Sequence, residues 1–398
     1  HYAKFRCDLK QNLVYIFFYL NQVLKIAVLF TNYGPYHIAR VSALHQHFHQ
    51  IGWNVVGIEL ARSEADYAWK ANLQNLPFPL ISVVSDRQRE EVKCYELLPK
   101  LYSTLRKVQP DVVVIAGYFE SAMVATLVWS LWHGKLPILL SETTETDFTR
   151  IWWRETIKRW LLNRYKSALV GGQPQQRYLI KLGVPKEAIF CGYNVVGNDA
   201  FHPDKIKSLA PPLKKPYFLA INRFIPKKNL PFIISAYATY RQLAKDRAWD
   251  LVLCGDGSMR SQIEQQIKDL GLTKFIHITG FLQQQELLPY FAHAGCFIHA
   301  STHEQWGLVV NEAMAAGLPV LVSNRCGCFE DLVVEGINGF GFNPYDREQL
   351  TKLMFKVSSG KIDLDNLSQA ALEHIQKFSP DYFAEGLIKA AKYALANH

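Results

Sequence analysis

Short apolar segments typical of buried strands alternate with helical stretches along most of this chain. The predicted strands of a first set cover residues 24–30, 54–58, 80–84, 111–116, 136–140 and 167–171, with helices between them, notably at 36–51 and 89–108. The predicted strands of a second set cover residues 217–221, 250–254, 275–278, 296–299 and 319–322. Alternating strands and helices are typical of parallel sheets whose strands are joined by crossover helices. The pattern therefore predicts an α/β fold with two parallel sheets.

A proline-containing stretch, residues 203–216, separates the two sets of strands. Proline can neither continue a helix nor donate to a strand ladder, so we interpret this stretch as a hinge between domains. We expect an extension over residues 1–23, a first domain over 24–205, a second domain over 206–377 and a C-terminal helix within 378–398. A chain of 398 residues has room for two domains of about 150–200 residues each.

The first domain is expected to begin at residue 24, although the apolar run starts earlier. Residues 13–30 are mostly apolar and nearly long enough to span a bilayer, but Asn21, Gln22 and Lys25 interrupt the run near its middle. The segment 24–30 therefore reads better as a buried first strand that ends in a loop. A short anchor or signal segment in the extension is the alternative.

Charge and cysteine content restrict the partners and the compartment. The net charge of +9 permits an anionic partner such as a nucleotide sugar, an anionic lipid surface or nucleic acid. No recognised nucleic-acid-binding module is present, so we expect no nucleic-acid partner. The seven cysteines lack zinc-type spacing, and we interpret them as reduced thiols of a cytoplasmic protein.

Two carboxylates, Glu304 and Glu312, lie on either side of a glycine that is predicted to begin a helix. The open backbone N–H groups of Gly307, Leu308 and Val309 at such a helix start can bind a phosphate. Carboxylates accept strong hydrogen bonds from sugar hydroxyls. A phosphate site beside two such acids describes a nucleotide sugar, whereas the alternative is a surface helix with two solvated acids.

Two cations, Arg223 and Lys228, stand five positions apart in a loop between a predicted strand and a helix. A diphosphate leaving group gains negative charge as its bond to the sugar breaks, so fixed cations stabilise the transition state more than the ground state. The alternative is a solvated basic turn. Lys227 is interpreted as a bystander.

Several sequence blocks resemble the retaining glycosyltransferases of family 4. The segment EQWGLVVNEAMAAGLPV at 304–320 resembles their E-x(7)-E signature. Further blocks follow in the family order: NRFIPKKN at 222–229, LVLCGDG at 251–257, ITGFL at 278–282, and the residues Gly327, Glu330, Asp331, Asn338, Gly339 and Phe340. Together they cover most of residues 217–350. The chain departs from the family at Asn222, where a glycine is usual.

This resemblance implies a GT-B fold, in which two Rossmann-like, doubly wound domains face each other across a cleft and the last helix returns to the first domain. It implies retaining transfer of a hexose from a nucleotide-sugar donor to a glycan, lipid-linked or small-molecule acceptor. No cofactor is implied. Because cations and a helix start already offset the phosphate charge, and no aspartate cluster has metal-ligand spacing, we expect no metal either.

The resemblance also implies a role for individual residues. The implied donor site comprises Gly34, Arg223, Lys228, Gly255, Gly280, Phe281, Glu304, Gly307, Leu308, Val309 and Glu312. Within it, Arg223 and Lys228 are expected to contact the diphosphate. Glu312 is expected to bind the ribose, and Glu304 to approach the transferred sugar.

The acceptor side of the site departs from the family pattern. Many family members carry a His-Asp or similar pair near residues 141–147, and this chain has Glu142 there. The catalytic candidates are therefore Glu304, together with Glu142 and His37, and Asp147 stays open as a further acid or base.

Two other functions are compatible with parts of the pattern. Nucleotide-sugar epimerases share the GT-B architecture, but they lack this spacing of Glu304 and Glu312 with its alanine-rich block. A protein that binds an anionic ligand without catalysis is a second alternative. It would be expected to lose Arg223, Lys228 or a glutamate, and all of these are present.

The segment 150–166 contains six basic residues, one acid and three tryptophans. The favoured interpretation is a packing helix whose Trp153, Ile157, Trp160 and Leu161 face the domain core at helical spacing. A basic helix with tryptophans also suits an anionic lipid surface. We therefore predict peripheral attachment at the inner face of a membrane, through the side of the helix that the core leaves free.

Overall fold

The structure is a computed structural model, which describes residues 23–63, 73–147 and 150–397. The chain divides into two compact units, one comprising His1–Val195 and Pro380–His398 (unit 1) and the other Val196–Ser379 (unit 2). The expected extension over residues 1–23, with its alternative anchor or signal, falls almost entirely outside the described residues. No helix in the described ranges is long and apolar enough to span a membrane.

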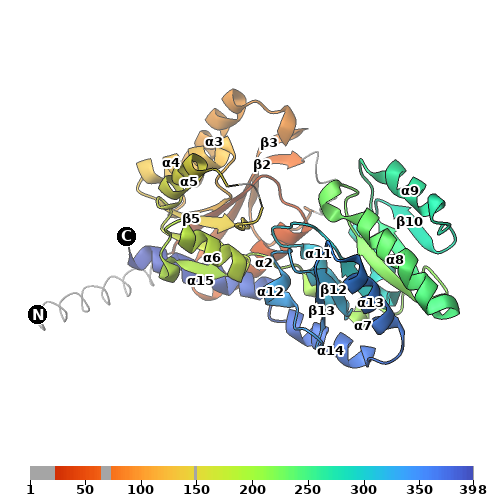
Figure 1. The fold of residues 1–398 in the computed structure, drawn as a ribbon. Helices are drawn as coiled ribbons and strands as arrows, with labels where there is room; N and C mark the ends of the chain where they lie inside the picture. The colour runs from red at the N-terminus through yellow and green to blue at the C-terminus, as the bar shows by residue number, and fades with distance from the viewer. Residues whose placement is uncertain (1–22, 64–72, 148–149, 398) are drawn as a thin grey trace, which may run out of the picture. The chain divides into compact units, whose positions relative to one another are not determined.

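Unit 1 is built on a seven-stranded parallel sheet in the order β3-β2-β1-β4-β5-β6-β7 (Figure 1). Its strands are β1 (Lys25–Phe30), β2 (Asn54–Ser63), β3 (Leu80–Gln88), β4 (Val112–Ala116), β5 (Leu136–Ser141), β6 (Ser167–Val170) and β7 (Ile189–Cys191). Its helices are α2 (Pro35–Gln50), α3 (Cys94–Val108), α4 (Ser121–Trp132), α5 (Trp152–Leu162), α6 (Gln173–Lys181) and α15 (Pro380–Ala396), with short 3₁₀ turns η1 (Arg89–Glu91) and η2 (Lys186–Ala188).

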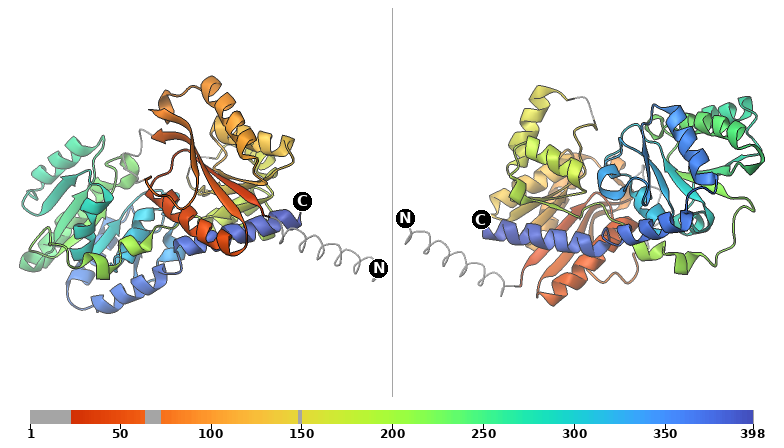
Figure 2. Two further views of the ribbon diagram at one scale, coloured as in Figure 1. Left: turned by 180° about the vertical axis from the view of Figure 1, so that it is seen from behind. Right: turned by 60° about the horizontal axis from the view of Figure 1, so that its bottom comes forward.

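The apolar strands of unit 1 are covered by helices on both faces, as a doubly wound fold requires. Successive side chains of a strand point to opposite faces, so Ala27 and Leu29 of β1 pack in one core cluster with residues of α3 and α4. On the other face, α15 lies along α2 and contacts β6 (Figure 2). A Cβ on Gly386 of α15 would lie 2.4 Å from the carbonyl oxygen of Cys191, which shows how closely this helix packs on β7.

Unit 2 repeats the doubly wound topology in a six-stranded parallel sheet, β10-β9-β8-β11-β12-β13. Its strands are β8 (Tyr217–Ile221), β9 (Asp250–Cys254), β10 (Ile276–Gly280), β11 (Cys296–His299), β12 (Val320–Ser323) and β13 (Gly339–Phe342). Its helices are α7 (Pro203–Ile206), α8 (Leu230–Ala244), α9 (Arg260–Asp269), α10 (Gln284–His293), α11 (Leu308–Ala315), α12 (Phe329–Leu332), α13 (Arg347–Ser358) and α14 (Leu364–Ile375), with 3₁₀ turns η3 (Asn198–Ala200), η4 (Pro226–Lys228) and η5 (Lys245–Arg247). The predicted α/β class with two doubly wound domains is confirmed.

The boundaries between the units differ from the expected ones at 205/206 and 377/378. The first lies between Val195 and Val196, because the chain already packs on unit 2 before the prolines begin. The ring of Phe201 lies 5.5 Å from that of Phe291 in α10, and α7 contacts α10 as well. The second boundary lies just before Pro380, where α15 begins.

The packing interpretation of the helix at 150–166 is wrong for most of its apolar residues. Trp153, Ile157 and Trp160 are exposed on α5, and only Leu161 is partly buried against the core. The buried position of this helix is Leu162. The inward face instead carries polar side chains, Glu155 and Lys158, that bond to neighbouring elements.

Candidate functional site

The centre of the predicted donor site is Glu304, in the loop between β11 and α11 of unit 2. Its carboxylate pairs with the ammonium groups of Lys228 and Lys227, the latter at 3.3 Å. It also accepts a hydrogen bond of 3.2 Å from the hydroxyl of Ser301. Both lysines come from the loop after β8, so the carboxyl ends of two adjacent strands supply one cluster of opposite charges.

Main-chain hydrogen bonds hold the Glu304 loop between two others. The amide of Thr302 donates to the carbonyl of Lys227 at 2.9 Å, and the amide of Gly327 donates to the carbonyl of Glu304 at 2.9 Å. The guanidinium of Arg325 donates to the Thr302 carbonyl, also at 2.9 Å. The position of the Glu304 carboxylate is therefore set by the backbone of three loops, which is the arrangement that a preorganised binding group needs.

Glu304 is ionised in this environment. Burial raises the pKa of Glu304, but its contacts with His299 and the charges of Lys228 and Lys227 outweigh burial and hold that pKa well below its usual range. The carboxylate can therefore act only as a hydrogen-bond acceptor or as a negative charge near neutral pH, and it cannot act as a general acid.

The contribution of Glu304 to stability should fall in acid. Because folding lowers its pKa, the ionised carboxylate stabilises the folded state above its unfolded pKa of about 4.3, and this contribution is lost as pH falls toward the lower folded pKa. The unfolding free energies of the native protein and of Glu304→Gln should differ by a constant amount above about pH 5 and converge below about pH 4. Urea unfolding across this range measures the difference, and a difference unchanged by acid would contradict the ion-paired state.

Sequence reasoning missed His299, a fully buried residue at the end of β11. Burial lowers the pKa of His299, so the ring is neutral. Its Nε2 lies 3.3 Å from the hydroxyl oxygen of Ser301 and 3.8 Å from the carboxylate of Glu304. Since the Ser301 hydroxyl donates to Glu304, it can accept from an Nε2–H of His299, and the ring then supports the carboxylate through the serine. The sequence signal that could have indicated His299 is its position as a polar residue at the end of an apolar strand.

The helix start is where the sequence predicts it. Gly307 precedes α11 with φ of 106°, a left-handed conformation that favours glycine, and it has no side chain with which to cap the first turn. The N–H groups of Leu308 and Val309 therefore lie at a helix N-terminus without a capping side chain, the arrangement that suits an anion. Trp306 fixes the approach to the helix through a hydrogen bond of 2.9 Å from its Nε1 to Asn311. Glu312 is buried on the same helix.

The two predicted diphosphate cations lie in the loop between β8 and α8, but their surroundings differ. Arg223 is exposed, whereas Lys228 is mostly buried against Glu304. Lys227, interpreted from sequence as a bystander, shares Glu304 with Lys228. Asn222, which stands where the family usually has glycine, is buried, and neither polar atom of its side-chain amide has a hydrogen-bond partner among the described residues.

Gly255 and Gly280, two glycines of the predicted donor site, join the ends of the adjacent strands β9 and β10. The amide of Gly255 after β9 donates to the carbonyl of Gly280 at the end of β10, at 2.8 Å. Both glycines have positive φ, and an ideal Cβ on Gly255 would lie only 1.8 Å from the carbonyl oxygen of Asn222. Phe281, the next residue after Gly280, is exposed. These strand ends lie at the edge of the sheet where doubly wound folds bind ligands.

In unit 1, His37 belongs to the first turn of α2. Its Nδ1 accepts a hydrogen bond of 3.3 Å from the amide of Gly34, the residue that precedes the helix, and its ring packs on Phe30. Burial, together with the nearby charge of Arg40, lowers the pKa of His37 to about 3. The ring is therefore neutral with its proton on Nε2, the one ring nitrogen that can still donate.

The two acids near the end of β5 have different environments. Glu142 accepts a hydrogen bond of 2.9 Å from Asn194, and its charge acts on the buried Arg40. Asp147 instead accepts hydrogen bonds from both the amide, at 2.7 Å, and the hydroxyl of Thr144. Both acids are therefore held by neighbours in unit 1, Asp147 by its own turn and Glu142 by Asn194.

A metal site is not evident where the structure describes the chain: no group of three or more His, Cys, Asp or Glu side chains in those residues is placed to hold an ion.

Comparison with known proteins decides which family this site belongs to. Residues 201–374 match the model of the glycosyl transferases group 1. This segment is a group 1 glycosyl transferase domain. It includes every residue of the donor site described in unit 2, from Asn222 to Glu312.

Two relatives match segments of the chain that differ in length. Sulfoquinovosyl transferase SQD2 of Arabidopsis thaliana is 25% identical over 300 residues, which are 71% of this chain and 56% of the relative. Alpha-monoglucosyldiacylglycerol synthase of Acholeplasma laidlawii is 27% identical over 168 residues, 42% of this chain and 41% of the relative. The chain thus spans about half the length of these relatives.

Solved structures identify the fold. The Anabaena protein HepE in complex with UDP-glucose superposes with a TM-score of 0.71 at 19% identity, covering 92% of this chain and 99% of that one. The predicted GT-B fold is confirmed.

Proposed function

We propose that this protein is a retaining hexosyltransferase of family 4 that uses a nucleotide-diphosphate sugar as donor and works without a metal. The observation that carries the proposal is Glu304, ionised and paired with Lys228, next to the glycine that begins α11. Cations, an uncapped helix start and a hydroxyl-binding carboxylate in one group 1 domain fit a diphosphate joined to a sugar. They favour transfer over epimerisation or binding without catalysis.

In this proposal the protein acts mainly on the leaving group. Arg223, Lys228 and the amides of Leu308 and Val309 stabilise the charge that develops on the departing diphosphate. Glu304 accepts hydrogen bonds from the transferred sugar, and Glu312 from the ribose. The acceptor then attacks the face that the diphosphate leaves, which retains the configuration, and the leaving phosphate helps to accept the acceptor's proton.

The acceptor is a glycan, a lipid-linked molecule or a small molecule. The name of the Acholeplasma laidlawii relative states a product built on diacylglycerol, which supports the lipid-linked class for this chain. Glu142 and His37 are proposed as the acceptor-side groups. The protein would work in the cytoplasm, at the inner face of a membrane if the acceptor is lipid-linked.

The test is a panel of nucleotide sugars that vary in both base and hexose. Each is incubated with the purified protein, and thermal stabilisation and donor hydrolysis are measured. We expect a subset of the panel to raise Tm, because ligands that bind only the folded state stabilise it. Failure of every nucleotide sugar and nucleoside diphosphate to raise Tm would contradict the proposal.

Metal removal should leave activity unchanged. The diphosphate charge is offset by Arg223, Lys228 and the start of α11, so no bridging cation is needed. Once a donor is identified, initial rates are compared after EDTA treatment and after adding back Mg²⁺ or Mn²⁺. Activity that EDTA abolishes and Mn²⁺ or Mg²⁺ restores would contradict metal independence.

A further inference from the structure

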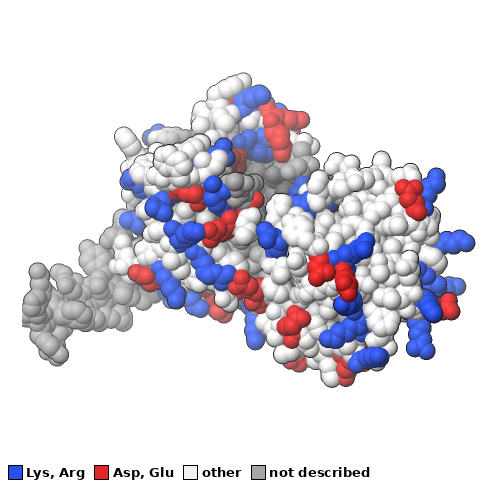
Figure 3. All heavy atoms as spheres, viewed as in Figure 1, with Lys and Arg blue, Asp and Glu red and all other residues white. Residues whose placement is uncertain are grey.

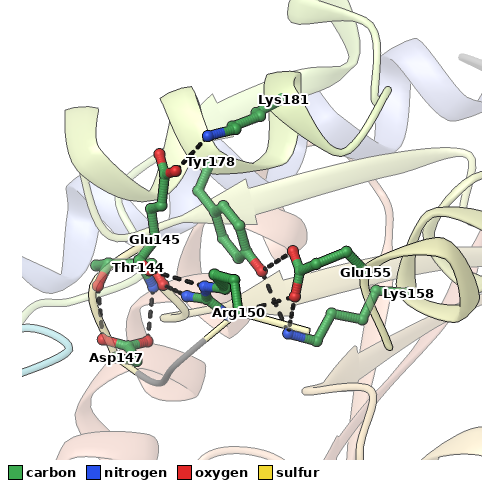
Figure 4. Close-up of polar contacts among 8 residues, drawn as sticks. All are labelled: Thr144, Glu145, Asp147, Arg150, Glu155, Lys158, Tyr178 and Lys181. Carbon is green, nitrogen blue, oxygen red and sulfur yellow. Dashed lines mark hydrogen bonds and ion pairs between the residues drawn. The ribbon is translucent and has the colours of Figure 1, made fainter. Parts of the chain in front are cut away.

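One face of α5 is fixed to unit 1 by a polar network (Figure 4). The carboxylate of Glu155 accepts hydrogen bonds from Lys158 at 2.8 Å and from the hydroxyl of Tyr178 in α6 at 2.7 Å. The guanidinium of Arg150, just before the helix, lies 4.4 Å from the centre of the Tyr178 ring and 3.6 Å from Glu155. Arg150 also donates to the carbonyl of Glu145 at 2.7 Å.

This network fixes the rotation of α5 about its axis. Tyr178 is buried, Lys158 is largely covered, and burial together with the hydrogen bond to Glu155 raises the pKa of Tyr178, which therefore stays a neutral donor. Residues three or four apart share one face of a helix, so anchoring Glu155 and Lys158 leaves Trp153, Ile157 and Trp160 together on the opposite face.

The outward face of α5 is apolar and unusually exposed. Its four large side chains are Trp152, 81% exposed, Trp153, 46%, Ile157, 56%, and Trp160, 61%. Soluble proteins seldom expose clustered aromatic residues unless the surface contacts another molecule.

The charges that accompany these side chains are all positive. The only acid of segment 150–166, Glu155, is engaged in the inward network. The exposed charged residues of α5 and the turn after it are Arg154, Arg159 and Arg164. Arg154 lies over the ring of Trp153 at 5.2 Å, and Arg164 over that of Trp160 at 4.7 Å. In the space-filling view, an uncharged area over α5 is bordered mainly by blue Lys and Arg groups, with red acidic atoms at its lower edge (Figure 3).

We propose that this surface, comprising Trp152, Trp153, Ile157 and Trp160 with Arg154 and Arg164, docks onto an anionic lipid bilayer. Tryptophan rings favour the headgroup level of a membrane, where guanidinium groups meet lipid phosphates. The helix has 11 residues, too few to span a bilayer, so it would lie in the plane of the interface. A second copy of this surface fits poorly, because a symmetric contact would bring the arginines of both copies together.

Two pairs of variants of the full chain test the surface. Arg154→Glu with Arg164→Glu reverses its charge, and Trp153→Ala with Trp160→Ala removes two of its rings. The matched controls are Lys268→Glu with Lys274→Glu, two exposed lysines of unit 2 that give the same net charge, and Tyr345→Ala, which removes an exposed ring of unit 2. All altered side chains are exposed, and circular dichroism and Tm check that each variant is folded.

Binding is measured by co-sedimentation with vesicles of phosphatidylcholine alone and with roughly one third phosphatidylglycerol. We expect the native protein to bind the anionic vesicles and to be released by about 0.5 M NaCl, because salt screens exposed charges. The charge-reversal variant should weaken the partition coefficient about tenfold or more, because it replaces two cations near the surface by anions. The tryptophan variant should also weaken it, because it removes two rings that favour the headgroup level. The controls should bind like the native protein.

Several results would overturn the proposal. Equal binding to neutral and anionic vesicles, or no binding to either, would show that the surface does not recognise anionic lipid. Binding that the α5 variants leave intact would assign attachment to another part of the chain, and equal weakening in the charge control would indicate net charge alone. A variant that changes the oligomeric state but not vesicle binding would assign the surface to a second copy. The assay contains no donor or acceptor, so its outcome is independent of the proposed transferase activity.

Discussion

Replacing Glu304 with glutamine should lower kcat about a hundredfold or more, with a much smaller effect on the KM for donor. In the proposed mechanism the carboxylate meets the sugar while its bond to the diphosphate breaks, so the contact is strongest in the transition state. The matched variant is Glu312→Gln on the adjacent helix. Because the proposed partner of Glu312 is the ribose, which is remote from bond breaking, this change should raise KM for donor and leave kcat within a few-fold.

Steady-state kinetics at varied donor concentration separate these effects. Full turnover by Glu304→Gln at saturating donor would show that this carboxylate has no role in the chemical step. A loss of kcat shared equally by Glu304→Gln and Glu312→Gln would show that the two acids act as one binding group. Comparison of Tm values controls for loss of folded protein, since Glu304 also pairs with two lysines.

Replacing Gly255 with alanine should destabilise unit 2 by at least about 3 kcal/mol. The residue has φ of 134°, and its new Cβ would lie 1.8 Å from a backbone oxygen of Asn222, which cannot move without shifting the end of β8. Gly271→Ala is the matched control. That glycine also has positive φ, 66°, but a Cβ there meets nothing within 4 Å, so only the left-handed conformation, worth about 1 kcal/mol, opposes it.

Chemical unfolding of both variants measures the difference. Equal destabilisation by Gly255→Ala and Gly271→Ala would contradict this prediction. It would mean that the ends of β8, β9 and β10 can move apart at little cost in unfolding free energy. Donor binding by Gly255→Ala gives a second measurement, because the same shift would disturb the loop that carries Arg223 and Lys228.

Most strands could be predicted because a buried parallel strand is apolar along its whole length. Leu136–Ser141 and Cys296–His299 are examples of such runs, and both strands lie where they were expected. The strands β7 and β13 were not predicted. Ile189–Cys191 has only three residues, and Gly339–Phe342 alternates glycine with phenylalanine, so neither differs locally from a loop. Pairing with the neighbouring strands β6 and β12 makes them strands, and that pairing is not visible in a local pattern.

The orientation of α5 could not be predicted from periodicity. Trp153, Ile157 and Trp160 follow spacings of four and three, and Glu155, Lys158 and Leu162 follow spacings of three and four. Both sets form a helical stripe, so the hydrophobic stripe was assigned to the core by default. The partner that decides otherwise is Tyr178, which is distant in sequence and presents a hydroxyl to Glu155.

The positions of the predicted donor-site residues depend on the sequence to different degrees, for a related reason. Glu304, Gly307 and Glu312 are close in sequence, so their placement before and on one helix follows from local spacing. The contacts of Glu304 with Lys227 and His299 depend on β8 and β11 being neighbours in the sheet. That adjacency is a property of the topology, and the roles of these residues stay predictions until variants are measured.

The discontinuity of unit 1 has a consequence for the order in which the chain can fold during synthesis. Unit 2 is one continuous segment, so its sheet can close as soon as residue 379 leaves the ribosome. Unit 1 contains the first strands to be made, yet its face at β6 and β7 stays uncovered until α15 arrives with its buried side chains, among them Phe383 and Leu387. The sheet face at β6 and β7 must therefore stay exposed while all of unit 2 is translated, so the nascent chain is most prone to aggregation at this face of unit 1.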